Sequence, residues 1–309
     1  MIKPKELKPN STIGIISPSY WLDDKMLKKT SKYFTDLGYN IILGSSNFLR
    51  YGPFAGTPQD RAKDIHAMFK NPKVDAIICA RGGYGANKVL PLLNYDLIKN
   101  NPKIFLGYSD ITAFLLSISQ KTELITFHGP MLSSFKENFI DYNYVHMLQV
   151  LQLDNKRKIF SSPSSPVKVL NPGIGRGRIW GGNMTLLINR LGTPNALSTD
   201  NIILFLEDVN EYFYSFERNL IHMYESKMLN NIKGLIIGEL YNFKDEPVPF
   251  NKNTDEIVMS VCNELNIPII SNFPCGHGKY QCTLPISVPV ELNVTSNKPY
   301  IEILEDAVQ

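Results

Sequence analysis

A serine occupies the junction between two apolar segments in KIFLGYSDITAFLLSI, residues 103–118. On a tight turn from a strand into a helix, a serine side chain is held out from the sheet and can act as a nucleophile. The next backbone N–H, that of Asp110, then lies at the helix N-terminus and can stabilise an oxyanion. The G-x-S-x-G pattern of such turns is incomplete, because Ile111 takes its last position. On the pattern alone, Ser109 or Asp110 could equally be a simple helix cap.

A nucleophilic serine needs a base, and the chain has five histidines. His277 lies between two glycines just after an expected strand, on a loop that can approach another element. His128, in TFHGP, is the second candidate base. The remaining three lie in helix-like segments and are expected to be packed or solvated: His66, His146 and His222.

The base in turn needs an acid that fixes its tautomer. Two apolar strands offer one: NIILFLEDVNE carries Glu207 and Asp208, and GLIIGEL carries Glu239. A carboxylate that closes a buried strand lies at the rim of the sheet, although such a residue often only marks the return to solvent. Spacing does not choose between Glu207 and Glu239.

Two further motifs could bind a phosphate or a metal. RGGYG (81–85) lacks both the G-x-G-x-x-G spacing and the P-loop lysine–serine pair, so backbone donors near a reacting carbonyl fit it better than a phosphate cradle. Cys275, His277 and Cys282 are soft ligands, but they lie in one short loop with no second cluster. We therefore expect no metal and no organic cofactor.

The elements that position these residues follow an alternating pattern in the first half of the chain. In this half, short apolar strands alternate with amphipathic helices, which predicts a parallel sheet covered by helices on both faces, that is, a flavodoxin-like α/β domain. Ligands of such sheets bind beyond the carboxyl ends of the strands, where RGGYG and GYSD both fall. Strands are expected at 12–17, 39–44, 74–80, 103–107 and 124–127, and helices at 25–38, 57–71 and 111–119.

The second half is expected to be a smaller, sheet-rich α+β domain. A polar segment rich in Ser, Pro and Gly, 158–177, interrupts the alternating pattern and is interpreted as the linker. The predicted domains are therefore 1–160 and 178–309, joined by 161–177. Beyond the linker, strands separated by fewer helices are expected at 202–207, 234–240, 267–272 and 287–294.

Composition excludes several classes of protein. The net charge is +3, from 32 basic and 29 acidic residues that are scattered along the chain, so no nucleic-acid partner is expected. No apolar run approaches the roughly 18 to 20 residues that span a bilayer, and the N-terminus has no signal-peptide pattern. The four cysteines show no CxxC pair and no disulfide spacing, which favours reduced thiols. A cytoplasmic protein without a membrane partner is expected.

An ordered succession of motifs resembles the LD-carboxypeptidases, the serine peptidase family that also includes the microcin C7 self-immunity proteins. No single motif is decisive, but their order over nearly the whole chain is specific. The motifs are IGIISPS, DRAKDIHAMF, VDAIICARGGYG, KIFLGYSDITAF, TFHGP, GRIWGGNMTLLINRLGTP, ILFLEDVNE with ERNL, GLIIGEL and CGHGKYQCTLPI.

The resemblance implies a Ser-Glu-His triad and thereby selects Glu207 over Glu239 and His277 over His128. The implied site residues are Ser109, Glu207 and His277 as the triad, the backbone N–H groups of Asp110 and Gly83 as the oxyanion hole, and Arg81 and Asn183 as substrate contacts.

The activity implied is release of the terminal D-alanine from muropeptide tetrapeptides during cytoplasmic cell-wall recycling, by a homodimer. One alternative is the immunity-type hydrolysis of aminoacyl-adenylate-like amides, with Trp180 or the region 241–250 stacking on the adenine. Another is an amidohydrolase that works through His128 without Ser109. The third is a non-catalytic α/β binding protein, because a fold alone does not establish chemistry.

Overall fold

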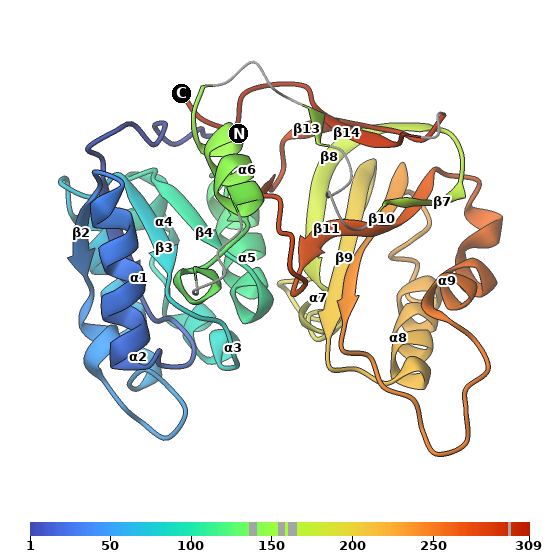
Figure 1. The fold of residues 1–309 in the computed structure, drawn as a ribbon, viewed down its shortest axis with the longest axis horizontal. Helices are drawn as coiled ribbons and strands as arrows, with labels where there is room; N and C mark the ends of the chain where they lie inside the picture. The colour runs from blue at the N-terminus through green and yellow to red at the C-terminus, as the bar shows by residue number, and fades with distance from the viewer. Residues whose placement is uncertain (136–140, 154–157, 160–165, 296–297) are drawn as a thin grey trace. The chain divides into compact units, whose positions relative to one another are not determined.

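The computed structural model describes residues 1–135, 141–153, 158–159, 166–295 and 298–309. The chain divides into two compact units (Figure 1). The first unit comprises Met1–Asn155, Thr283–Ser287 and Asp306–Gln309, and the second comprises Lys156–Cys282 and Val288–Glu305.

The sheet of the first unit has the strand order of a flavodoxin-like fold. Within the described residues, the order across the sheet is β12-β5-β4-β3-β1-β2. Strands β1 to β5 are parallel, and β12 pairs antiparallel with β5 at one edge. The predicted parallel sheet is thus confirmed. Its strands are β1 (Thr12–Ile16), β2 (Asn40–Leu43), β3 (Ala76–Cys79), β4 (Ile104–Gly107), β5 (Phe127–His128) and β12 (Leu284–Pro285).

Helices cover both faces of this sheet, which explains why the central strands β3 and β4 are apolar and buried at every position. Right-handed crossovers place α1 on one face and α2, α4 and α5 on the other, where these three pack side by side. No helix in the described part of the chain is long and apolar enough to cross a membrane. The helices are α1 (Asp24–Asp36), α2 (Pro58–Lys70), α3 (Ala86–Val89), α4 (Tyr95–Lys99), α5 (Thr112–Thr122) and α6 (Asp141–Leu151).

The chain reverses its direction across the sheet between β1 and β3. Parallel sheets bind their ligands at such a switch point, beyond the carboxyl ends of the strands. The segments that leave the sheet there are 17–19 after β1, 80–85 after β3 and 108–110 after β4. The first unit therefore brings the GYSD and RGGYG motifs to the same edge.

The second unit is built on a mixed sheet, as the sheet-rich prediction requires. Its order among the described residues is β6-β14-β13-β8-β9-β10-β11-β7. The four central strands, β8 to β11, are parallel, which the sequence did not indicate. The strands are β6 (Lys158–Ile159), β7 (Lys168–Asn171), β8 (Ile174–Asn183), β9 (Ile202–Val209), β10 (Gly234–Tyr241), β11 (Ile269–Gly276), β13 (Pro289–Asn293) and β14 (Tyr300–Ile303).

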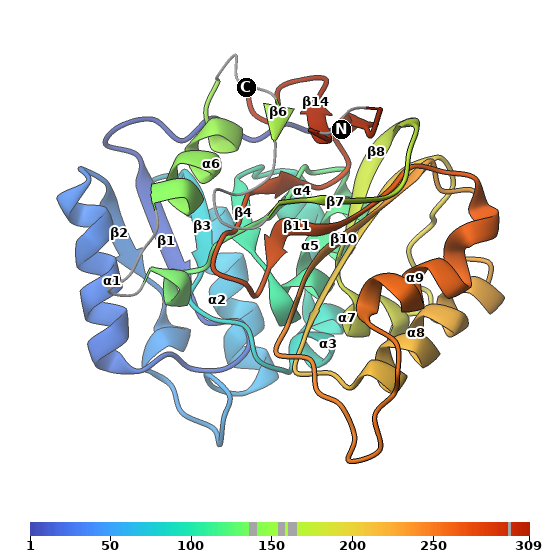
Figure 2. The same ribbon diagram turned by 45° about the vertical axis from the view of Figure 1, so that its right-hand side comes forward.

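Three helices connect the parallel strands of this sheet: α7 (Met184–Ile188), α8 (Phe213–Glu225) and α9 (Thr254–Cys262). Helices α8 and α9 lie side by side on one flank of the sheet (Figure 2). The carboxyl ends of β8, β9, β10 and β11 lie next to one another, so that Asn183 pairs with Glu207 and Glu239 pairs with Gly276. The second unit thus also gathers its candidate residues at the carboxyl ends of parallel strands.

The segment predicted to be a linker contains regular structure. Residues 168–171 form β7 and residues 174–177 begin β8, while 161–165 lie outside the described residues. Pro172 and Gly173, which are part of the linker signal, form the connection between these two strands, where Gly173 has a φ of +147°. Two short C-terminal pieces also return to the first unit: Ile286 N–H donates to Thr126 (2.7 Å) and Gln309 N–H donates to Pro4 (2.9 Å).

Candidate active site

Ser109 stands on a strained turn between β4 and α5. Its φ is +63°, in the left-handed region that costs a non-glycine residue about 1–2 kcal/mol. Gly107 is required two residues earlier, because a Cβ there would lie 2.8 Å from Cγ2 of Ile111. The buried Ile111 therefore fills the last position of the incomplete elbow pattern by packing on Gly107. A backbone held in this conformation is typical of a nucleophile turn.

The glycine-rich loop after β3 packs directly against this serine. A Cβ on Gly82 would lie 2.9 Å from Cβ and 3.1 Å from Oγ of Ser109, so only glycine allows this approach. Gly83 has a φ of +123° and lies under the ring of Tyr20, which leaves no space for a side chain. Tyr20 N–H donates to the Gly82 carbonyl at 3.3 Å. The backbone of the loop is thereby fixed beside Ser109.

Arg81 precedes these glycines and is exposed to solvent. Its Nη1 donates to the Trp21 carbonyl at 3.3 Å, and its guanidinium carbon lies 5.7 Å from the centre of the Tyr20 ring. These contacts orient a cationic group near the Ser109 turn without burying it.

In the second unit, Glu207 and His277 form a hydrogen-bonded pair. Nδ1 of His277 lies 2.7 Å from Oε2 of Glu207, whose side chain is fully buried, while that of His277 is 16% exposed. Because a carboxylate only accepts, Nδ1 carries the proton of this bond and Nε2 is left as the basic nitrogen. This is the arrangement of a base oriented by an acid.

The environment of the pair makes the imidazole more basic than usual. Burial lowers the pKa of His277, but the charge of Glu207, its hydrogen bond and the charge of Asp208 together raise that pKa above its ordinary value. Gly276 permits the contact, because a Cβ there would lie 2.8 Å from Cβ of Glu207. Gln281 Nε2 donates to the Gly276 carbonyl at 2.5 Å and closes the histidine loop.

Asn183 lies at the end of β8, where it caps α7. Its Oδ1 accepts from Leu186 N–H (3.3 Å) and its Nδ2 donates to Oδ1 of Asp208 (2.8 Å). Asp208 also accepts from the N–H and hydroxyl of Thr185. Burial and the charge of Glu207 raise the pKa of Asp208 to about 6, although its hydrogen bonds oppose this. Both ends of the Asn183 carboxamide thus have partners within the protein.

The competing acid lies against the histidine loop, beside Gly278, whereas the competing base lies in the first unit. Glu239, on β10, lies beneath the backbone of Gly278, and burial raises the pKa of its carboxyl to about 7. His128 lies on β5 of the first unit, 1% exposed, with its ring 6.1 Å from that of Tyr108. The other histidines belong to α2, α6 and α8. Glu207 is thus the candidate acid whose carboxylate forms a hydrogen bond with His277, at 2.7 Å.

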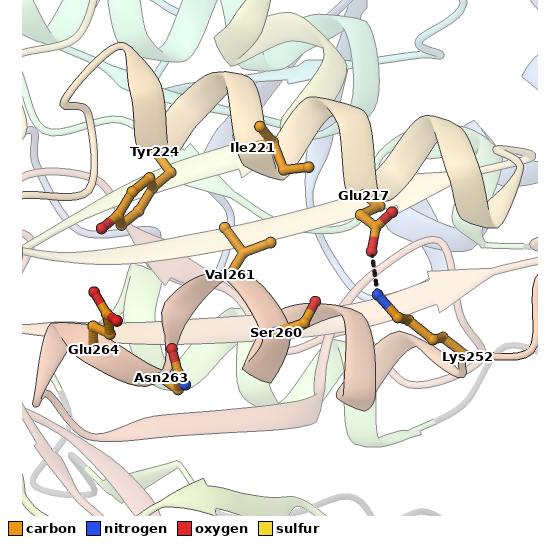
Figure 3. Close-up of a pocket in the computed structure, with 8 residues that line it drawn as sticks. All are labelled: Glu217, Ile221, Tyr224, Lys252, Ser260, Val261, Asn263 and Glu264. Atoms are coloured by element: carbon orange, nitrogen blue, oxygen red, sulfur yellow. Dashed lines mark hydrogen bonds and ion pairs between the residues drawn. The ribbon is translucent and has the colours of Figure 1, made fainter.

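Two buried thiols and a groove are further features of the second unit that could take part in chemistry or in binding. Burial raises the pKa values of Cys275 and Cys282, which keeps both thiols protonated. Across the described residues, no cluster of three or more His, Cys, Asp or Glu side chains could hold a metal ion. A groove of about 420 Å³ lies between α8 and α9 (Figure 3), and its lining includes the Lys252–Glu217 ion pair (2.8 Å) but none of the predicted site residues.

The structure thus brings the predicted residues together in two groups. Ser109, Asp110 and the loop with Arg81 and Gly83 meet in the first unit. Glu207, His277 and Asn183 meet at the strand ends of the second unit. The supporting roles of Ser19, Gly82 and Asp208 were not predicted from the sequence. Ser19, three residues after β1, and the second carboxylate beside Glu207 were visible in the sequence, but their partners were not.

Both halves of the chain match one family. Residues 13–129 match the LD-carboxypeptidase N-terminal domain, and residues 176–292 match the LD-carboxypeptidase C-terminal domain. A probable murein peptide carboxypeptidase of Bacillus subtilis is 32% identical over 304 residues, which cover 97% of this chain and 94% of that relative. The microcin C7 self-immunity protein MccF of Escherichia coli is 30% identical over 283 residues, 82% of this chain and 79% of its own.

A solved structure gives the same result for the fold. The muramoyltetrapeptide carboxypeptidase from Oxalobacter formigenes has a TM-score of 0.83 at 26% identity, covering 96% of this chain and 99% of its own. The resemblance predicted from the motifs is confirmed by these similarities. Family models match both units, and the Bacillus subtilis relative is 32% identical over 97% of this chain. The chain therefore belongs to the LD-carboxypeptidase family of serine peptidases.

Proposed function

We propose that this chain is a serine LD-carboxypeptidase that hydrolyses the L,D peptide bond holding the terminal D-alanine of muropeptide tetrapeptides. The observation that carries the proposal is the left-handed backbone of Ser109, directly after β4 and against the Gly82 backbone. Such strain persists where the surrounding structure enforces it, and it clusters at active sites. Membership of the family and relatives named for murein peptides support the substrate class.

In the proposed reaction, Nε2 of His277 takes the proton of Ser109 as its hydroxyl attacks the scissile carbonyl. Glu207 holds the opposite nitrogen at 2.7 Å and stabilises the imidazolium that forms. The proposal requires the two units to bring Nε2 within hydrogen-bond reach of the serine Oγ during turnover.

The tetrahedral oxyanion is stabilised by the backbone N–H groups of Asp110 and Gly83. Each such donor contributes about 3 kcal/mol in comparable sites. When the intermediate collapses, His277 protonates the departing amine and D-alanine leaves. Water, activated by the same imidazole, then hydrolyses the acyl ester on Ser109. Every step is served by a side chain or a backbone donor of this chain, so the mechanism calls for no cofactor.

A carboxypeptidase must also bind the terminal carboxylate of its substrate. Arg81 can do so with two parallel hydrogen bonds, because its guanidinium is exposed and oriented by Trp21 and Tyr20. Asn183 is assigned to the lining of the substrate pocket. Its carboxamide already bonds to Leu186 and Asp208, so any contact with substrate would share these bonds.

We further propose that the reaction takes place in the cytoplasm, in the recycling of cell-wall fragments, and that the enzyme is a homodimer without a nucleic-acid or membrane partner. The four cysteines are free and buried, which fits a reducing compartment. Sedimentation of the purified protein tests the dimer.

The second candidate function is the immunity-type hydrolysis of aminoacyl-adenylate-like amides, supported by the similarity to MccF. Such an activity needs an aromatic surface for the adenine. Tyr241, at the end of β10, is 54% exposed, and Trp180, on β8, is half-buried, so either could supply that surface.

The experiment compares three substrates with the wild-type enzyme: a muropeptide tetrapeptide ending in D-alanine, the same peptide ending in L-alanine, and an aminoacyl sulfamoyl adenosine. We expect kcat/KM for the D-alanine peptide to exceed the other two by about 10²-fold or more. Preference for the nucleoside amide would favour the immunity-type function. Failure to cleave any of the three, together with no labelling of Ser109 by a fluorophosphonate, would favour the binding protein.

A further inference from the structure

The side chain of Asp110 has no part in the reaction proposed above, which uses only its backbone N–H. It is nevertheless 2% exposed, directly beside the reactive serine. Taking a carboxylate out of water costs several kcal/mol unless hydrogen bonds and opposite charge compensate. The partners of this buried group therefore indicate what it does.

Three donors converge on the Asp110 carboxylate. The hydroxyl of Ser19 donates to Oδ2 at 2.5 Å, and the backbone N–H of Ala86 donates to the same oxygen at 3.0 Å. The backbone N–H of Gly85 is the third donor. Ser19 follows β1, and Gly85 and Ala86 end the glycine-rich loop after β3. One carboxylate thus ties together the segments that leave three neighbouring strands.

Arg61, on α2, supports this arrangement from behind. It is 1% exposed, and its Nη1 donates to the carbonyls of Pro18 (2.9 Å) and Gly85 (3.2 Å). Burial raises the pKa of Asp110, whereas the bonds from Ser19, Ala86 and Gly85 and the charge of Arg61 oppose that rise. The guanidinium thus offsets the buried charge and fixes the carbonyl side of the same loop.

Little freedom remains in the loop between these bonds and Ser109. A Cβ on Gly85 would lie 2.9 Å from Nη1 of Arg61, and a Cβ on Gly82 would lie 2.9 Å from Cβ of Ser109. The end of the loop at Gly85 and Ala86 is therefore fixed by hydrogen bonds to Asp110 and Arg61, and its beginning at Gly82 packs against Ser109. Its middle holds Gly83, the proposed second oxyanion donor.

We propose that the Asp110 carboxylate, with Arg61 behind it, is a positioning group that sets the loop 82–86 against Ser109 and so sets the geometry of the oxyanion hole. The inference rests on the proposed function, because it presumes that Ser109 is the nucleophile. Oxyanion donors must hold their positions to within about 0.5 Å. They act on the transition state rather than on the bound substrate, so their displacement lowers kcat and leaves KM almost unchanged.

The same unit offers a matched control in Asp64, on α2. This carboxylate is 4% exposed and accepts from the backbone N–H groups of Ser45 and Ser46, both at 3.0 Å, and from the hydroxyl of Ser46. Like Asp110, it is held by two backbone N–H groups and by serine hydroxyls, and the hydroxyl of Ser45 donates to it as well (3.4 Å). It ties the segment after β2, not the glycine-rich loop. Asp64→Asn therefore reports the cost of disturbing a buried carboxylate without disturbing the oxyanion hole.

The experiment measures kcat and KM for D-alanine release from the tetrapeptide, together with Tm, for Asp110→Asn, Ser19→Ala and Asp64→Asn. An asparagine cannot accept from all three donors, so we expect Asp110→Asn to lose about 10²-fold in kcat with KM within about 3-fold of wild type. Ser19→Ala removes one bond to the same oxygen and should lose about tenfold in kcat. Asp64→Asn should lose comparable Tm but keep the wild-type kcat.

If Asp110→Asn fails to fold, Ser19→Ala still tests the inference, because it removes only one hydroxyl and should leave the fold intact. The inference is overturned if Asp110→Asn and Ser19→Ala lose no more kcat than Asp64→Asn, or if KM rises as much as kcat falls. Ser109→Ala is assayed alongside them. An inactive Ser109→Ala with unaffected Asp110 and Ser19 variants overturns the inference alone, whereas an active Ser109→Ala overturns the proposed function and the inference together.

Discussion

The first unit holds its proposed nucleophile with backbone geometry, whereas the second unit holds its proposed base with buried charge. Ser109 owes its position to a left-handed φ and to glycines at 82 and 107 that admit close packing. His277 owes its position and basicity to the fully buried Glu207 at 2.7 Å. A nucleophile that must be exposed but fixed is best held by the main chain. A base that must change its charge is best held by a partner whose charge is constant.

This difference predicts that the first unit is sensitive to small steric changes and the second to changes of charge. Four substitutions test it, beginning with the largest expected effect.

Loss of the base should have the largest effect. His277→Ala should lower kcat on the order of 10⁴- to 10⁶-fold, because no other group can take the serine proton, while Tm changes little. D-alanine release measured beside His222→Ala, a histidine on the exposed face of α8, gives the comparison. An active His277→Ala together with an inactive His128→Ala would transfer the role of base to the first unit.

Removing the charge of Glu207 should affect both rate and pH profile. Activity needs neutral His277, so the acid limb of kcat/KM in the wild type should lie above the ordinary imidazole value of about 6.5. Glu207→Gln removes the charge that raises the pKa of His277, so burial, which lowers that pKa, becomes the largest influence. The acid limb of the variant should therefore move to lower pH. We expect kcat to fall about 10³- to 10⁴-fold. An acid limb that stays in place would show that Glu207 does not tune the base.

A single methyl group should damage the first unit. Gly82→Ala places a Cβ 2.9 Å from that of Ser109 and should lower kcat about 10²-fold by displacing the neighbouring oxyanion donor. Gly38→Ala is the control, because it strains a φ of +89° with no atom within 4 Å. That variant should lose Tm and keep its kcat. Equal kcat values in Gly82→Ala and Gly38→Ala would contradict the claim that catalysis needs the close approach of Gly82 to Ser109.

The smallest effect concerns stability and Glu239. Its pKa rises from about 4.3 in the unfolded chain to about 7 in the fold, so the folded state binds the proton more tightly. The ionisation of Glu239 therefore destabilises the folded state. This loss of folding free energy is absent below about pH 4.3, grows as pH rises, and is complete above about pH 7. Glu239→Gln should therefore raise Tm more at pH 8 than at pH 5. Glu225→Gln, on the exposed surface of α8, controls for the lost charge.

The sequence predicted the order of elements in the first sheet and the edge at which its candidate residues gather, because alternating strands and helices carry strong periodic signals. It could not choose between Glu207 and Glu239 by spacing, since both close apolar strands and only the fold brings one of them to a histidine 70 residues away. The resemblance made that choice. Two-residue strands such as β12 have no periodicity, so the return of 283–287 to the first unit was not predictable.

Contacts across long stretches of chain were equally hidden. Asp110 could be interpreted as a helix cap, whereas its carboxylate bonds to Ser19, 91 residues earlier. Pro172 and Gly173 added to the linker signal of 158–177, because turn residues give the same signal between two strands as between two domains. The local signals were correct, but their structural context was set by packing.

The most direct test compares the release of D-alanine from a muropeptide tetrapeptide by the wild type and by Ser109→Ala, after Tm has shown that the two are equally stable. The account predicts release by the wild type and a loss on the order of 10⁶-fold in the variant, because the nucleophile has been removed. Release by Ser109→Ala at the wild-type rate would contradict the claim that the strained turn after β4 exists to hold a nucleophile.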